Sequence, residues 1–153
     1  MLTLDVDADG DLDVLTSMDG HGYGLYWFEQ TTQGNVISFT PHEILALTPG
    51  GDNFSQLHAI NLADFNGDGL SDLVTGKRWW AHQGADPGAN DPAVVYWFEL
   101  KHTAGTVPTF VPHQVHNDSG VGLQVCTADL NGDGRPDIAA ANKKGLHLHL
   151  QTP

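Results

Sequence analysis

Three short segments of the chain place carboxylate or amide side chains at alternate positions around a glycine. They are residues 5–13, 64–72 and 129–137. In each nine-residue segment, positions 1, 3 and 5 are Asp or Asn, position 6 is Gly, and position 9 is Asp. A hard dication takes six to eight oxygen ligands at about 2.3–2.6 Å, and alternate residues of one loop can supply them. The spacing therefore predicts about three Ca²⁺ sites.

The predicted ligands are the side chains at positions 1, 3, 5 and 9 and the backbone carbonyl at position 7. Position 6 is expected to turn sharply, which a glycine allows. A donor set made only of oxygen favours calcium over zinc or copper. The predicted metal-binding residues are Asp5, Asp7, Asp9, Asp11, Asp13, Asp64, Asn66, Asp68, Leu70, Asp72, Asp129, Asn131, Asp133, Arg135 and Asp137.

Two other interpretations of these segments fit less well. An EF-hand needs a bidentate Glu at position 12 and flanking helices, but position 12 is Thr16, Thr75 or Ala140, and strand-like runs follow the loops. Simple Asp/Asn/Gly turns would explain any single copy. Three copies with an acid at positions 1, 5 and 9 favour metal binding.

The segments lie inside a longer repeat. Their first residues are 59 and 65 positions apart (64 − 5 and 129 − 64), which is the period of repeated supersecondary units. The aromatic run at 24–29 recurs at 94–99, and the Pro-His run at 39–44 recurs at 110–115. The second unit holds four strand-like runs, at 57–63, 72–76, 93–101 and 109–116, separated by turn residues.

Four-stranded units at this period predict an all-β fold made of antiparallel β-propeller blades. We expect a single domain over residues 1–153, with blade 1 at about 1–46, blade 2 at about 55–116 and a partial blade 3 at about 121–151. Propellers close with about four to eight blades, whereas this chain holds about two and three-quarters. We therefore expect either a longer polypeptide or a homo-oligomer that closes the ring, for example two copies forming a six-bladed disc.

The composition restricts the partners. Asp and Glu outnumber Lys and Arg 19 to 6, which gives a net charge of −13. This charge argues against nucleic acid or an anionic membrane as a partner, and no apolar run is long enough to insert into a membrane. The first residues show no signal peptide. The single cysteine, Cys126, excludes an intrachain disulfide, and its apolar neighbours predict that it is buried.

The segments at 63–77 and 128–139 resemble the FG-GAP and VCBS repeats that form integrin α-subunit propellers and occur in many bacterial surface proteins. The longer pattern, with Gly76-Lys77-Arg78 and the aromatic run at 96–99, is similar to propeller domains of the aldos-2-ulose dehydratase type. The resemblance implies that each calcium loop joins the first two strands of its blade, on one face of the disc. It also implies that function lies on the opposite face or in long insertions.

Such an insertion separates the second and third predicted strands of unit two, at 77–92. Paired Trp side chains with cations and a His on a Gly/Pro-rich loop are typical of a sugar-binding surface. Alternatively, the Trp pair continues the strand and packs between blades, and the cations pair with loop acids. The candidate ligand-binding residues are Lys77, Arg78, Trp79, Trp80 and His82.

Several other aromatic and His residues are interpreted as structural. Trp27 and Trp97 recur at matching positions and are expected in the core, and His42 and His113 recur at a blade edge. His147 and His149 alternate along one strand but lack a recognisable third metal ligand.

No known catalytic motif is present, so we assign no catalytic residue. The sequence favours a non-catalytic calcium-binding module for adhesion or for carbohydrate or protein binding. Such a module is expected to be extracellular, periplasmic or on the cell surface. Two alternatives stay open, namely the propeller part of a sugar-active lyase or dehydratase, and a structural scaffold.

Overall fold

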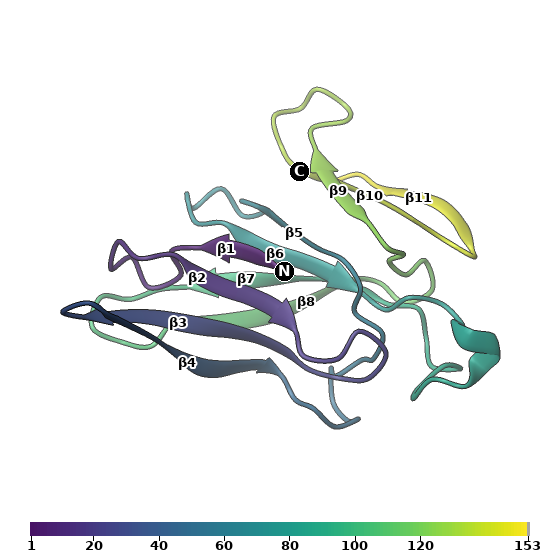
Figure 1. The fold of residues 1–153 in the computed structure, drawn as a ribbon. Helices are drawn as coiled ribbons and strands as arrows, with labels where there is room; N and C mark the ends of the chain where they lie inside the picture. Colours follow the sequence, from purple (N-terminus) through teal and green to yellow (C-terminus); the bar gives the residue numbers. More distant parts are fainter. Residues whose placement is uncertain (153) are drawn as a thin grey trace.

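The computed structural model describes residues 1–152 and contains three antiparallel β-sheets that follow one another along the chain (Figure 1). The first sheet has the order β1-β2-β3-β4, the second β5-β6-β7-β8 and the third β11-β10-β9. The strands are β1 (Leu2–Leu4), β2 (Asp13–Ser17), β3 (Leu25–Gln33), β4 (Val36–Leu45), β5 (Ile60–Ala63), β6 (Asp72–Gly76), β7 (Val95–Lys101), β8 (Thr109–His116), β9 (Val125–Ala128), β10 (Asp137–Asn142) and β11 (Gly145–His149).

The prediction of an all-β fold with four-stranded antiparallel units is confirmed. In the second unit, β6 and β8 have the predicted bounds, and β5 and β7 begin a few residues later than predicted. Polar Asp-Gly segments end the first strand of each sheet and begin the second, which is why the boundaries could be predicted from the sequence. The third sheet has three strands within residues 1–152.

The hydrophobic core lies between the sheets. One cluster joins blade 1, through Leu15 and Trp27, to blade 2, through Leu73 and Phe98. A second cluster joins blade 2 to blade 3 through residues that include Val74 and Ile138. Successive side chains of a strand point to opposite faces, so Leu73 and the adjacent Val74 serve different cores.

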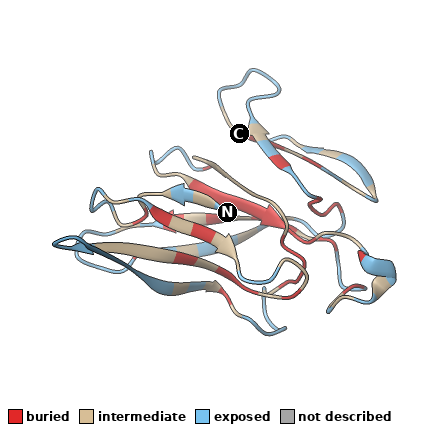
Figure 2. Cartoon of the chain, in the orientation of Figure 1, coloured by how far each residue is buried: buried red, intermediate tan, exposed pale blue. Residues whose placement is uncertain are grey.

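Strand β6 is buried along its whole length because the central sheet is covered on both faces (Figure 2). The outer strand β4 is mostly exposed. The two cores thus hold the three sheets together as neighbouring blades.

Cys126 is exposed, so the prediction that it is buried is wrong. The residue pairs with Ala139 across β9 and β10, whereas the neighbouring pair, Ile138 with Thr127, places Ile138 in the core with blade 2. Cys126 therefore points to the outer face of blade 3, away from blade 2. An apolar setting in the sequence did not reveal which face this residue occupies.

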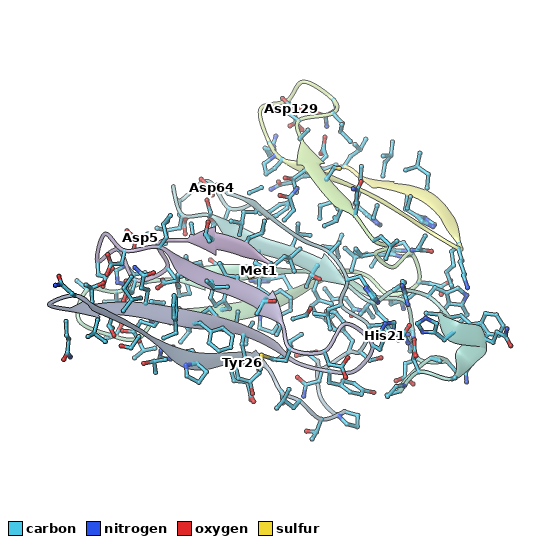
Figure 3. All side chains as sticks on the ribbon, in the orientation of Figure 1. Met1, Asp5, His21, Tyr26, Asp64 and Asp129 are labelled. Carbon is cyan, nitrogen blue, oxygen red and sulfur yellow. The ribbon has the colours of Figure 1, made fainter. Side chains whose placement is uncertain are left out.

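The connections between strands fall at two opposite ends of the sheets. The β1–β2, β5–β6 and β9–β10 loops carry Asp5, Asp64 and Asp129, which follow one edge of the molecule (Figure 3). The β2–β3, β6–β7 and β10–β11 connections leave from the opposite ends of β2, β6 and β10. This second end carries the insertion at 77–92.

Within residues 1–152 the one helix is the short 3₁₀ turn η1 (His82–Gly84) in the insertion. None of the described residues forms a helix long and apolar enough to cross a membrane.

Candidate functional site

The three Asp-rich loops share one pattern of hydrogen bonds. In each loop, the side-chain oxygen at position 3 accepts the backbone N–H of position 5 at 2.9–3.2 Å. The oxygen at position 5 accepts the N–H of position 7 at 2.8–3.0 Å. The carboxylate at position 1 accepts the N–H of the glycine at position 6 at 2.8–3.2 Å. These bonds turn side-chain oxygens of positions 1, 3 and 5 toward the inside of each loop.

Two positions of each loop have positive φ angles. The predicted turn glycines, Gly10, Gly69 and Gly134, have φ of 98°, 88° and 85°. Position 4 also has positive φ, and it is occupied by Gly67, by Gly132 and, in the first loop, by Ala8 at 59°. Because the first loop has alanine at position 4, the sequence did not reveal this second requirement.

The Asp at position 9 fastens its loop to the third strand in blades 1 and 2, and in blade 3 to Gln151, two residues after the third strand. These three side chains are fully buried, and all three make the same pair of bonds. In blade 2, Asp72 Oδ2 accepts the N–H of Phe65 at 2.9 Å and Oδ1 accepts that of Leu100 at 2.9 Å. Asp13 and Asp137 repeat both bonds at 2.8–2.9 Å. Each carboxylate oxygen has a second lone pair, so metal ligation at position 9 is compatible with this role.

The first loop has the donor set that best fits a cation. Oxygens of Asp5, Asp7 and Asp13 lie within 4.8 Å of one another. Asp5 Oδ1 is buried without a hydrogen-bond partner among residues 1–152. Burial raises the pKa of Asp7 and of Asp13 above the ordinary value for aspartate. A bound calcium ion would ligate Asp5 Oδ1 and would balance the negative charge of the three carboxylates.

The second and third loops carry less negative charge. An amide replaces the position-3 carboxylate, and its nitrogen donates to position 5, from Asn66 to Asp68 at 2.9 Å and from Asn131 to Asp133 at 3.1 Å. The first loop holds five carboxylates, and the other two hold three each. Arg135 Nε also lies 3.7 Å from a carboxylate oxygen of Asp133. We therefore expect the first loop to bind calcium most tightly.

At the opposite end of the sheets, β6 ends at Gly76, so Trp79 and Trp80 do not continue the strand. Trp80 is 39% exposed and Trp79 is half-buried. Lys144 Nζ lies 4.3 Å from the centroid of Trp79, and Lys143 Nζ lies 5.5 Å from that of Trp80. These cation–π contacts join the insertion to the β10–β11 turn.

The insertion forms one side of an open groove of about 760 Å³, and blade 3 forms the other. Apolar, aromatic and cationic groups face it together. The lining residues are Arg78, Trp79, Ala81, His82, Gly122, Leu123, Gln124, Ala141, Asn142 and Lys143.

Lys77 does not belong to this surface, which corrects its place among the candidate ligand-binding residues. Its side chain is fully buried, and Nζ donates to the backbone carbonyl of Arg78 at 3.4 Å. Burial lowers the pKa of Lys77 below the ordinary value for lysine. The strand pattern ends one residue earlier, so the sequence did not show that Lys77 still points into the core.

The recurring His residues form matching structural units. His42 stacks on Trp27 with ring centroids 4.2 Å apart, and its Nε2 lies 2.7 Å from Glu29. His113 stacks on Trp97 at 4.3 Å and reaches Glu99 at 3.0 Å.

The His pair of β11 does not form a metal site in the described part of the chain. His149 Nε2 lies 3.0 Å from Ser119 Oγ, and neither His147 nor His149 belongs to a group of three metal-ligating side chains. The structure instead brings together His21, His82 and Asp86. Sequence reasoning missed this group because the β2–β3 turn and the insertion are 65 residues apart.

The loop geometry, repeated on three adjacent blades, agrees with the comparison with known families. The FG-GAP-like repeat matches residues 5–75, and the FG-GAP repeat matches residues 121–145. The chain belongs to the FG-GAP repeat family. The FG-GAP matches contain all three Asp-rich loops, and the insertion at 77–92 lies between them.

No curated protein matches this FG-GAP chain. The similarity to propellers of the aldos-2-ulose dehydratase type stays a prediction.

Proposed function

We propose that the protein is a non-catalytic, calcium-binding propeller module that presents a ligand-binding groove at the end opposite its metal loops. The calcium assignment rests above all on the first loop, where three carboxylates converge and Asp5 Oδ1 is buried without a partner among residues 1–152. Three bound Ca²⁺ ions would add six positive charges and change the net charge from −13 to −7. Binding would therefore relieve repulsion among the loop carboxylates and stabilise the fold.

Calcium titration of chelator-treated protein tests this assignment. We expect about three ions per chain and a higher thermal midpoint with calcium than with a chelator. The double variant Asp5→Asn/Asp9→Asn should lose the tightest site and keep the others. If the thermal midpoint is the same with calcium and with a chelator, the assignment is wrong.

We propose that the groove binds a carbohydrate in preference to a protein ligand. Aromatic faces stack on the apolar faces of sugar rings, and cationic side chains bond hydroxyl or carboxylate groups. The groove places Trp79 beside Arg78 and Lys143, and Nζ of Lys143 also lies 5.5 Å from the ring centroid of the exposed Trp80. A sugar ring would thus meet an aromatic surface and charged donors together.

A glycan array followed by product analysis tests the groove. We expect the wild-type protein to bind a defined set of glycans and to leave them unchanged, and Trp80→Ala to bind them at least tenfold more weakly. Trp27→Phe, which alters a buried Trp of blade 1, serves as the control. Conversion of the glycan would support the lyase or dehydratase alternative, and an absence of glycan binding would support a protein ligand or a scaffold.

We also propose that the module works extracellularly, in the periplasm or on the cell surface. Calcium there is near millimolar, which fills sites of moderate affinity. Copies of the chain are proposed to complete the ring, because three blades leave one face of blade 3 uncovered. Because the chain carries a net charge of −13, nucleic acid is not among the proposed partners.

A further inference from the structure

The β2–β3 turn of blade 1 lies against the insertion of blade 2. The β2–β3 turn of blade 1 brings His21 there, and the insertion of blade 2 brings His82 and Asp86 (Figure 3 labels His21). His21 Nδ1 lies 3.3 Å from Asp86 Oδ2, and His82 Nδ1 lies 3.1 Å from both Asp86 oxygens. The two imidazole rings have centroids 4.5 Å apart.

One donor atom from each of these residues lies within 4.8 Å of the other two. A tetrahedral zinc ion holds nitrogen and oxygen donors at about 2.0–2.2 Å, which places them about 3.4 Å from one another. The side chains therefore need only small rotations to bind one ion. We propose that His21, His82 and Asp86 form a zinc-type divalent cation site between blade 1 and blade 2.

The donor atoms separate this site from the calcium loops. Two imidazole nitrogens and one carboxylate suit Zn²⁺ and related transition metals, whereas Ca²⁺ prefers oxygen donors alone. The two classes of site also lie at opposite ends of the sheets. The zinc site is thus independent of the calcium assignment.

The backbone around the site is firmly held. Gln56 is fully buried, its N–H donates to Gly22 O at 2.8 Å, and its carbonyl accepts the N–H of Arg78 at 3.1 Å. Ser55 Oγ donates to Pro87 O at 2.7 Å. Gly22 and Pro87 directly follow His21 and Asp86 in the chain, so these bonds position two of the ligands before any metal arrives.

The backbone at the third ligand has an unusual conformation. His82 and Gln83 have φ of 47° and 58°, although neither is glycine. Such conformations are rare for these residues and cluster at functional sites. In this conformation the ring of His82 lies beside both His21 and Asp86.

His58 lies next to the three proposed ligands, and the exposed side of the site leaves a fourth coordination position open. Its ring meets that of His21 edge-on at 5.1 Å, and its Nε2 is buried without a hydrogen-bond partner among residues 1–152. His21 and His82 have side chains 46% and 57% exposed, whereas that of Asp86 is 12% exposed. A bound ion would therefore be fixed by a largely buried carboxylate and would keep one side open to water or to a ligand in the groove.

Zinc titration of the full chain in excess calcium tests the site, because calcium occupies the Asp-rich loops. We expect one Zn²⁺ per chain, a higher thermal midpoint with zinc, and a Co²⁺ complex with the visible spectrum of nitrogen-ligated tetrahedral cobalt. His82→Asn removes the imidazole and keeps a residue that tolerates positive φ. This variant should weaken zinc binding at least tenfold.

His21→Asn changes an exposed turn and provides a second variant with the same expected loss. His102→Asn lies in the β7–β8 turn, at the opposite end of β7 from the insertion, and should bind zinc as the wild-type protein does. Equal zinc affinity in the wild-type protein and in both ligand variants would overturn the proposal. So would a cobalt complex without nitrogen ligation.

Discussion

At the scale of single residues, the Asp at position 9 combines two tasks in each blade. Its buried carboxylate accepts one N–H from its own loop and a second from the third strand or, in blade 3, from Gln151 just after that strand. The loop therefore keeps its place on the sheet without a metal ion. The sequence predicted a metal ligand at this position. The second hydrogen bond, which links the loop to a distant part of the blade, is seen only in the structure.

Replacing Asp72 with alanine should lower the free energy of unfolding by about 2–6 kcal/mol even in the presence of a chelator. The reason is that two buried backbone N–H groups lose their acceptor, at about 1–3 kcal/mol each. Chemical denaturation measures this change. Asp68→Ala, at an exposed position of the same loop, should weaken calcium binding and leave the chelated protein nearly as stable as before. If both variants lose the same free energy of unfolding in chelator, Asp72 does not stabilise the fold through these two hydrogen bonds.

Calcium binding should respond to pH differently in the first and third loops. Burial raises the pKa of Asp7 and of Asp13, whereas hydrogen bonds from the backbone of Gly134 and its neighbours lower the pKa of Asp129. A proton on a carboxylate blocks calcium, so as the pH falls the first loop should lose its affinity before the third.

Calcium titrations from pH 7 to pH 4 check this order in two variants. Asp64→Asn/Asp129→Asn retains the first loop, and Asp5→Asn/Asp64→Asn retains the third. The expected result is a higher midpoint pH for the variant that retains the first loop. Coincident midpoints would show that the two local environments do not control proton competition.

At the scale of elements, the loops and strands were predictable and the contacts between distant connections were not. Alternating Asp and Gly residues mark the start of β2, β6 and β10, because the Asp and Asn side chains at positions 1, 3 and 5 accept backbone N–H groups of their own loop. The burial of Lys77, the exposure of Cys126 and the group of His21, His82 and Asp86 depend on which faces and connections meet in space. No local pattern in one sequence encodes that.

The first loop should gain stability from Ala8→Gly, because Ala8 holds the positive φ that the other loops give to glycine. Relief of about 1–2 kcal/mol of backbone strain outweighs about 0.4–1 kcal/mol of added unfolded-state entropy. We expect a net gain of up to about 1.5 kcal/mol in chelator by chemical denaturation.

The reverse change, Gly67→Ala, meets no atom within 4 Å of the new Cβ. Its expected loss of about 1 kcal/mol would therefore be conformational. A destabilising Ala8→Gly would contradict the argument from positive φ.

At the scale of the whole molecule, blade 3 has one uncovered face. Leu146 and Leu148 are 70% and 56% exposed and pair with Ala141 and Ala139 of β10. Cys126 lies on the same face as Ala139. In a propeller this face packs against the next blade, which is why we expect a second copy of the chain to cover it.

Light scattering coupled to gel filtration should therefore show a dimer, and Cys126 should react more slowly with a thiol reagent at high protein concentration than after dilution. Leu148→Asp should shift the protein toward monomer and speed the reaction. A wild-type monomer at every concentration, with a thiol rate that does not change, would rule out ring closure by identical copies. The missing blades would then have to come from elsewhere.

The Asp-rich loops at one end of the sheets and the insertion at the other should differ in how many substitutions they tolerate. Each Asp-rich loop is fixed to its own blade by the same hydrogen bonds in all three copies, whereas the insertion is anchored at particular points, among them Ser55, Gln56 and Lys143, and its exposed residues lie between these anchors. The protein is therefore a natural support for loop grafting. A combinatorial library in the exposed part of the insertion should yield mostly folded members, while the same diversity at 64–72 should yield few.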